Sequence, residues 1–139
     1  MADTSLGFRF RYTLSGNPPI VGTYTIKDTE TLTKGDLVNL ESGEIDLAAT
    51  ADTALVGAVM ETKAGTDSTT EYKVIMNPDA VYGVYDASAR VAGATLDIAG
   101  TTGAMTIAAS SNTDVIVVAD SAADEETLVK IIVGSHYLD

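Results

Sequence analysis

The segment that decides the fold class is Ile20-Val21-Gly22-Thr23-Tyr24-Thr25-Ile26-Lys27, in which Ile20, Tyr24 and Ile26 fall on one face of an extended chain. Successive side chains of a β-strand point to opposite faces, so this alternation predicts a half-buried strand. Residues 44–47 and 95–98 alternate in the same way, and short apolar segments over 54–60, 115–119 and 128–133 are typical of buried strands. The abundance of Thr and Val, with turn-forming Gly and Asp between the segments, also favours strands. The sequence predicts an all-β protein.

The deciding segment has a second copy further along the chain. Tyr24-Thr25-Ile26-Lys27-Asp28 matches Tyr82-Gly83-Val84-Tyr85-Asp86 at an offset of 58 residues, which also aligns Gly35 with Gly93. An insertion near Gly100 shifts the offset to 60 and matches Ile45 with Met105. The two copies rejoin where Lys73-Val74-Ile75-Met76 matches Lys130-Ile131-Ile132-Val133. We therefore expect two pseudo-repeated halves, about residues 23–77 and 81–134.

The repeat has consequences for the architecture. One half cannot bury both faces of its strands, so two halves must pack around one core. We expect a compact β-barrel or sandwich, one domain over residues 20–139, with Asn77-Pro78-Asp79 as the turn between the halves. Gly35-Asp36 suits a tight turn, whereas Ala94 at the equivalent of Asp36 predicts a different turn in the second half.

The first 19 residues stand outside the repeat and are expected to form an extended N-terminal arm with a Pro-Pro linker at Pro18-Pro19. The alternation over residues 6–14 places the apolar side chains on one face and Arg9 and Arg11 on the other. One interpretation is strand addition to a partner, with the aromatic residues as anchors. The other is a first strand on the chain's own barrel. The candidate partner-binding residues are Leu6, Phe8, Arg9, Phe10, Arg11, Tyr12 and Leu14.

Charge and composition exclude several classes of function. The chain has 20 acidic and 8 basic side chains and a net charge of −12, so it lacks the basic cluster that nucleic acid or an anionic membrane requires. There is no cysteine, which excludes disulfides and thiolate chemistry. Neither a signal peptide at residues 1–5 nor a membrane-spanning apolar run is expected. The arm carries +1, and the remainder of the chain carries −13.

Catalytic and cofactor patterns are not found. His136 is the single histidine and is expected to be a surface or packing residue, since no nucleophile motif accompanies it. Asp52-Thr53-Ala54 resembles the turn of an aspartic protease, but the matching position is Asn112, and that chemistry needs two carboxylates. The acidic residues from Asp120 to Glu126 lack calcium-loop spacing and suggest a short helical turn. We expect no enzyme activity, cofactor or metal.

Two motifs carry a resemblance to a known family. Leu32-Thr33-Lys34-Gly35-Asp36-Leu37-Val38 follows a short arm, and Ala48-Ala49-Thr50-Ala51-Asp52-Thr53-Ala54-Leu55-Val56-Gly57-Ala58-Val59 precedes a β-rich second half. In this the chain resembles the head decoration (cement) proteins of tailed bacteriophages, of the β-tulip type. The resemblance implies a structural virion protein on the capsid exterior that binds the major capsid protein, stabilises the expanded head and self-associates, often as a homotrimer.

An alternative function belongs to a different class. A carbohydrate- or cell-surface-binding module of a virion tail or a secreted protein would present aromatic side chains as a platform. Tyr72, Tyr82 and Tyr85 are the clustered candidates outside the arm, although Tyr82 matches Tyr24 and is expected in the core.

Overall fold

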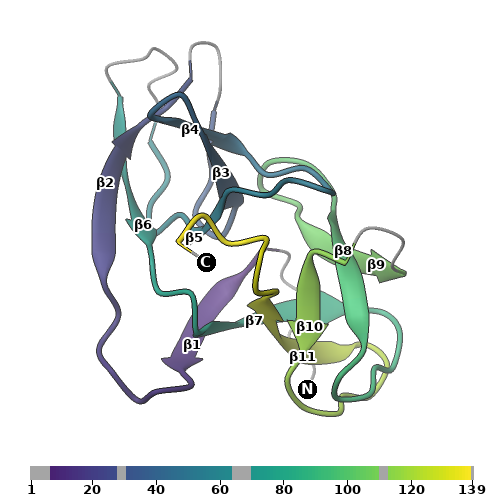
Figure 1. Ribbon diagram of the computed structural model, residues 1–139. Coiled ribbons are helices and arrows are strands. Elements are labelled where there is room, and N and C mark those ends of the chain that lie inside the picture. The colour runs from purple at the N-terminus through teal and green to yellow at the C-terminus, as the bar shows by residue number, and fades with distance from the viewer. Residues whose placement is uncertain (1–6, 28–30, 64–69, 110–112, 139) are drawn as a thin grey trace.

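The computed structural model describes residues 7–27, 31–63, 70–109 and 113–138. These residues form strands and turns without a helix, so the all-β prediction is confirmed (Figure 1). The strands are β1 (Arg9–Thr13), β2 (Val21–Thr25), β3 (Leu37–Glu41), β4 (Glu44–Leu47), β5 (Leu55–Ala58), β6 (Glu71–Ile75), β7 (Ala80–Asp86), β8 (Thr95–Ala99), β9 (Thr106–Ala109), β10 (Val115–Val117) and β11 (Glu125–Ile131). Within the described ranges, no helix is long and apolar enough to cross a membrane.

The strands form three antiparallel sheets, and the described residues do not close them into a barrel. One sheet has six strands in the order β1-β7-β11-β10-β8-β9. A pair, β2-β6, and a three-stranded sheet, β4-β3-β5, make up the rest. A bridge between Val59 and Val74 joins the end of β5 to β6. The architecture is therefore a sandwich-like packing of open sheets.

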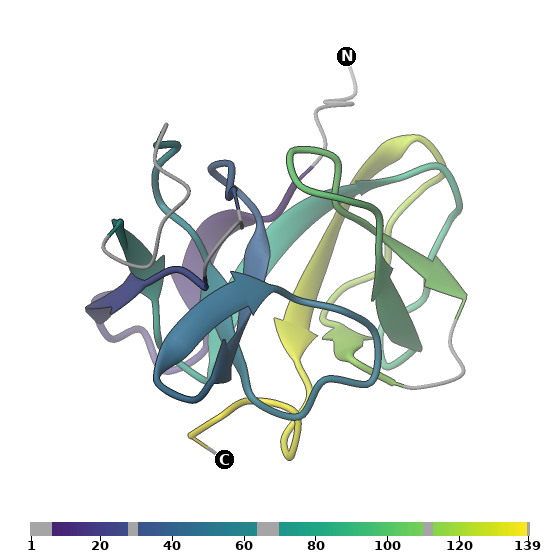
Figure 2. The ribbon, with the colours of Figure 1, turned by 90° about the horizontal axis from the view of Figure 1, so that it is seen from above.

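The predicted duplication appears in the strand order. The first half runs β2-β6, then β5-β3-β4, and the second half runs β7-β11-β10-β8-β9, so the corresponding strands have corresponding neighbours. Figure 2 shows the two halves side by side, with the C-terminal segment at their junction. The Asn77-Pro78-Asp79 turn joins the halves as predicted, closed by the bond from the Ala80 N–H to the Asn77 carbonyl. Among the described strands, β1 is the one without an equivalent in the other half.

Strand registers test the alignment of the repeats. Thr23 of β2 pairs with Lys73. Val81, which is the equivalent of Thr23 at the offset of 58 residues, pairs with Lys130. Equivalent residues therefore have the two lysines as partners, which confirms the predicted match of Lys73 with Lys130. The match of Ile45 with Met105 was wrong. Ile45 lies opposite Leu40, and the residue opposite Ile98, the equivalent of Leu40, is Ile107. The structural equivalent of Ile45 is therefore Ile107. The cause is loop length. Two residues with positive φ, Ser42 and Gly43, turn the first hairpin, whereas residues 100–105 connect β8 to β9.

The turn before β8 also differs from the prediction. The Asp36 N–H donates to the Thr33 carbonyl, and the Ala94 N–H donates to the Val91 carbonyl. Gly35 and Gly93 both adopt positive φ, at 95° and 91°. The backbone of the second turn is therefore the same as that of the first. Glycine at the third position determines the turn, because this position requires a left-handed conformation, and Asp36 is not needed to form it.

The halves share a core, as the repeat predicted. The larger hydrophobic cluster combines Leu37, Leu55 and Ile75 of the first half with the inward residues of β7 to β11, and Phe8 belongs to it. A second cluster fills the space between β2, β3 and β6. His136 is a packing residue of the junction, with its Nε2 atom 2.8 Å from the Val56 carbonyl oxygen.

Two buried carboxylates connect the halves by hydrogen bonds. Asp36 accepts the N–H of Thr33 in its own half and that of Gly103 in the other half, at 2.8 and 2.9 Å. Asp114 accepts the Ile98 N–H at 3.0 Å and the Ala51 N–H of the first half at 2.9 Å. Each half thus places one buried carboxylate against a loop of the other.

The acidic segment near residue 120 was predicted incorrectly. Residues 123 and 124 form a turn in which Asp124 has a positive φ of 60°, and β11 begins at the next residue. Acidic residues favour a first helical turn only when an amphipathic helix follows. Here the alternating β11 follows, and it packs between β7 and β10.

Candidate partner-binding surface

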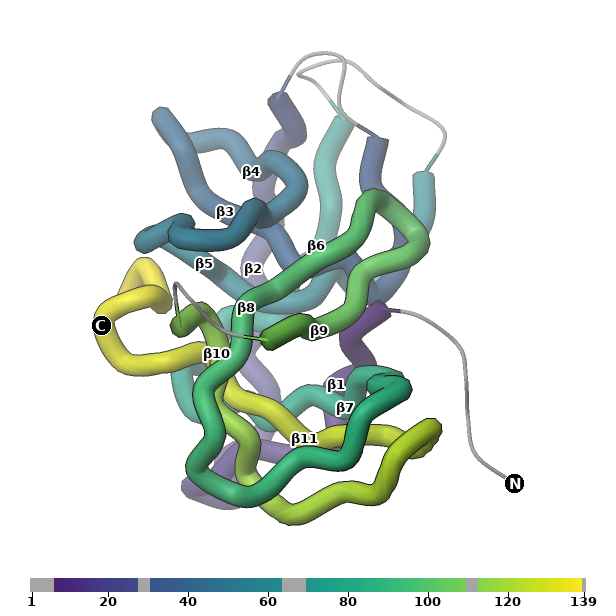
Figure 3. The backbone as a smooth tube through the Cα atoms, turned by 90° about the vertical axis from the view of Figure 1, so that its right-hand side faces the viewer, coloured from purple at the N-terminus to yellow at the C-terminus, as the bar shows by residue number. Residues whose placement is uncertain are grey.

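The predicted arm is extended, but residues 9–13 pair with the chain's own sheet. β1 runs antiparallel to β7, with Phe10 opposite Tyr82 and Thr13 opposite Ala80. Phe8 is 1% exposed and lies in the shared core. Figure 3 shows β1 alongside β7 and β11. This arrangement corresponds to the second interpretation from the sequence, and it corrects the expectation that Phe8 anchors in a partner, because that side chain is already buried.

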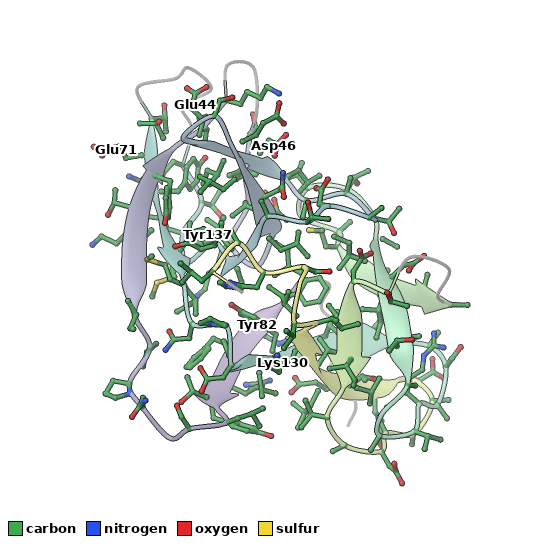
Figure 4. The ribbon with its side chains drawn as sticks, viewed as in Figure 1. Glu44, Asp46, Glu71, Tyr82, Lys130 and Tyr137 are labelled. Atoms are coloured by element: carbon green, nitrogen blue, oxygen red, sulfur yellow. The ribbon has the colours of Figure 1, made fainter. Side chains whose placement is uncertain are left out.

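Aromatic contacts attach β1 to the second half. Both phenylalanine rings of the chain, Phe8 and Phe10, meet the Tyr82 ring edge to face, each with centroids 6.4 Å apart. Tyr82 is labelled in Figure 4 at the centre of the molecule, and its hydroxyl accepts the Ala58 N–H of the first half. Burial raises the pKa of Tyr82, so its hydroxyl stays protonated.

An ion-pair cluster holds the other face of β1. Arg9 and Arg11 both donate to the Glu126 carboxylate of β11, Arg9 at 3.2 Å and Arg11 through its Nε atom at 2.8 Å. The Glu126 side chain passes over Gly83 of β7, where an added Cβ would lie 2.2 Å from the carboxylate oxygen. Because Gly83 has no side chain, the Glu126 carboxylate of β11 can cross β7 and bond to the arginines of β1.

Glu126→Gln tests this cluster. The hydrogen bond from Arg11 lowers the pKa of Glu126, and so does the one from Arg9. We expect the variant to lose about 1 kcal/mol of unfolding free energy at neutral pH, since the cluster is partly exposed. A carboxylate with a lowered folded-state pKa stabilises above its unfolded value of 4.5. Urea titrations should therefore show a loss that shrinks as the pH falls below that value, whereas a loss that persists at low pH contradicts the assignment. Glu125→Gln, at the exposed neighbour, is the control.

The linker after β1 is held against the turn between the halves. The Leu14 N–H donates to the Asp79 carbonyl, and the Ser15 N–H donates to the Asp79 carboxylate at 2.9 Å. Hydrogen bonding from Ser15, through its side chain first and its backbone second, lowers the pKa of Asp79. The Ile20 N–H donates to the Asn77 side chain at 2.6 Å. The Pro-Pro linker therefore lies along this turn.

Exposed apolar side chains occur along β1, this linker and the start of β2. Tyr12 is 42% exposed, Leu14 55%, Ile20 59% and Val21 42%. Of the predicted site residues, Tyr12, Leu14 and the exposed Arg11 remain accessible, Phe10 is half-buried, and Leu6 lies outside the described residues. Sequence reasoning did not include Ile20 and Val21 in the site, although Ile20 continues the face of Tyr24 and Ile26 and Val21 begins β2.

A hollow of about 570 Å³ opens between β1 and the first half. Its walls are largely apolar and include Phe8, Phe10, Pro19, Ala58, Met60 and Ile75. Arg9 and Lys34 also line it. Met60, which is exposed, was not predicted as a site residue, and no pattern in the sequence distinguishes it.

Comparison with solved structures identifies a similar fold. No protein-family model matches the chain, and no curated protein sequence matches it. The fold resembles a phage head-fibre base. The structure described as "head fiber gp8.5 N base in bacteriophage phi29" superposes with a TM-score of 0.50 at 17% identity, covering 84% of this chain and 98% of that chain. At this identity the likeness establishes a shared fold.

The structure also locates the residues that the sequence suggested for carbohydrate binding and for protease chemistry. Tyr72 and Tyr82 are buried in the two core clusters, and the half-buried Tyr85 donates its hydroxyl to Asp124, so the three tyrosines do not form an aromatic platform. Asp52 accepts the Ala49 N–H at 2.8 Å within its own turn. Asn112, the predicted counterpart of Asp52, lies outside the described residues.

Proposed function

We propose that this chain is a structural protein of a phage virion that binds the outer surface of the capsid and stabilises the expanded head. The observation that carries the proposal is the shared fold with the phi29 head-fibre base, which extends over nearly all of that chain. The motifs that resemble head decoration proteins point to the same setting independently of the fold.

The docking surface of this proposal is the apolar strip formed by Tyr12, Leu14, Ile20 and Val21. A capsid-binding face needs apolar anchors that stay exposed in the free protein, and four of the eight exposed large apolar side chains among the described residues lie here. Arg11, beside the strip, is available to approach acidic groups of the major capsid protein while it contacts Glu126. Bound copies associate with one another, as trimers, where capsomers meet.

Co-sedimentation with expanded heads of the phage that encodes the chain tests the proposal. We expect the wild-type protein to sediment with heads at a fixed copy number per shell. Tyr12→Ala combined with Leu14→Ala should weaken binding by about tenfold or more, which corresponds to about 1.4 kcal/mol. The matched control is Val91→Ala combined with Val133→Ala, two exposed valines outside the strip.

Absence of the wild-type chain from sedimented heads overturns the proposed function. If both double variants lose head binding equally, the assignment of the docking strip is overturned but the proposed function is not. Light scattering of the free protein tests the trimer separately. If the protein is a monomer at all concentrations, its copies can associate only when they are bound to the capsid.

A further inference from the structure

The duplication gives each half an equivalent edge, and the two edges differ in what covers them. In the second half, β1 pairs with β7. In the first half, β2 is the equivalent of β7, and it pairs with β6 alone among the described strands. Since the two halves share one strand order, the covered edge of β7 indicates what the open edge of β2 can hold.

The outer edge of β2 presents main-chain groups that do not bond to β6. The Met76 N–H donates to the Ile20 carbonyl and the Ile26 N–H donates to the Thr70 carbonyl, so the even-numbered residues of β2 face β6. Antiparallel pairing alternates, so Val21, Thr23 and Thr25 direct their N–H and C=O groups outward. β4 occupies the far end of this edge, where a parallel bridge joins Ile26 to Ile45 and the Lys27 N–H donates to the Ile45 carbonyl. The part of the edge that β4 does not reach is therefore at Val21 and Thr23.

The covered edge of β7 has the same pattern. The Leu14 N–H donates to the carbonyl of Asp79, which is the equivalent of Val21. Tyr12 lies opposite Val81 and Arg9 lies opposite Gly83, the equivalents of Thr23 and Thr25. The motif therefore accommodates an added antiparallel strand at these positions while β9 lies beside the far end of β7, as β4 lies beside β2.

The edge of β2 also lacks the features that keep edge strands from pairing. Residues 20–26 carry no charged side chain, and the register of β2 with β6 shows no bulge. By contrast, β1 has a register shift between Phe10 and Tyr12 and two arginines. Charges and bulges protect edges from strand addition, so β2 is the unprotected edge of the pair.

We propose that the open edge of β2 accepts an extended cationic–aromatic segment of a partner protein as an added antiparallel strand. The aromatic character follows from β1, whose phenylalanines pack on Tyr82, the equivalent of Tyr24 in β2. The positive charge complements the acidic body, and Figure 4 shows Glu44, Asp46 and Glu71 gathered at one end of the β2–β6 pair. The identity of the partner as a capsid protein rests on the proposed function, but the binding edge does not.

A peptide with the sequence of residues 7–14, added to the full chain, tests the edge directly. We expect saturable binding by fluorescence anisotropy, with slower amide hydrogen exchange at Val21 and Thr23. Thr23→Pro should weaken binding by about tenfold or more, because proline removes an outward N–H and leaves the bonds to β6 intact.

The control places a proline on another outer strand. Ala109 of β9 lies opposite Leu96, whose carbonyl accepts the Asp114 N–H from the other side, so the Ala109 N–H points outward. Ala109→Pro should leave peptide binding unchanged. Thermal unfolding of both variants checks that they fold, and Thr23→Lys, which adds an edge charge without removing an N–H, should also weaken binding.

Several outcomes overturn the proposal. Absence of peptide binding does so, as does slower exchange confined to β7, since the peptide would then have displaced β1. A wild-type dimer that Thr23→Pro converts to a monomer would show that the edge binds a second copy instead. Peptide binding at β2 by a chain that fails to sediment with heads would retain this inference and overturn the proposed function.

Discussion

Phe8→Ala is expected to lower the free energy of unfolding by about 3–5 kcal/mol, as large-to-small substitutions of buried phenylalanines do. The side chain is 1% exposed, belongs to the shared core and packs against Tyr82. Urea unfolding followed by circular dichroism measures the effect. The control is Tyr12→Ala on the same strand, which should cost less than about 1 kcal/mol because Tyr12 is largely exposed. A similar small cost for both variants would mean that residues 8–12 form a detached arm.

This result bears on a simpler experiment that the sequence suggested. If residues 1–14 formed an arm detached from the body, as one interpretation of the sequence has it, their removal would leave a folded body that no longer binds capsids. The structure changes that expectation, because the deletion removes β1, exposes the edge of β7 and takes Phe8 out of the core. Loss of binding after such a deletion would report on folding. Substitutions of the exposed Tyr12 and Leu14 are the sharper test of docking.

Asp114→Ala is expected to lower the free energy of unfolding by about 3 kcal/mol or more. The carboxylate is buried and accepts the N–H groups of Ile98 and Ala51 and the hydroxyl of Thr50 at 2.8 Å. Removing a shared acceptor leaves buried donors without a partner, at about 1–3 kcal/mol each. Because Ala51 and Thr50 belong to the first half, amide hydrogen exchange should also increase in their loop, where a purely local effect on β8 would leave exchange unchanged.

Asp120→Ala provides the matched control. This exposed carboxylate also accepts a backbone N–H, that of Ala92 at 2.8 Å, but it lies at the surface. We expect a cost of about 1 kcal/mol or less. Equal effects of the two substitutions would contradict the role of Asp114 in joining the halves.

The fold was predictable from the sequence where the evidence was local or periodic. Alternation in residues 20–27 identifies β2, and the offset of 58 residues finds its equivalent β7 because paired strands preserve length and register. The hairpin after β8 was misaligned, since loop length varies freely where the chain is exposed. The prediction of a helical turn before β11 was wrong, because a run of acidic residues alone does not distinguish the start of a helix from a tight turn.

The site was less predictable, for a different reason. Alternation correctly places residues 9–13 in an extended segment, but the partner of Arg9 and Arg11 is Glu126, more than 110 residues away in sequence. Nothing in the local pattern distinguishes an arginine that pairs in its own chain from one that pairs across an interface. The open edge of β2 has the same difficulty, because an absent neighbour leaves no sequence signal.

The single strand β1 also gives the molecule a direction. Two halves with the same strand order would each offer an equivalent outer edge, so a partner could bind the body in either of two orientations. With one edge occupied and the other open, the two orientations are no longer equivalent. A chain built by repetition can thus bind with a defined polarity, and it needs only five additional residues in β1 to do so.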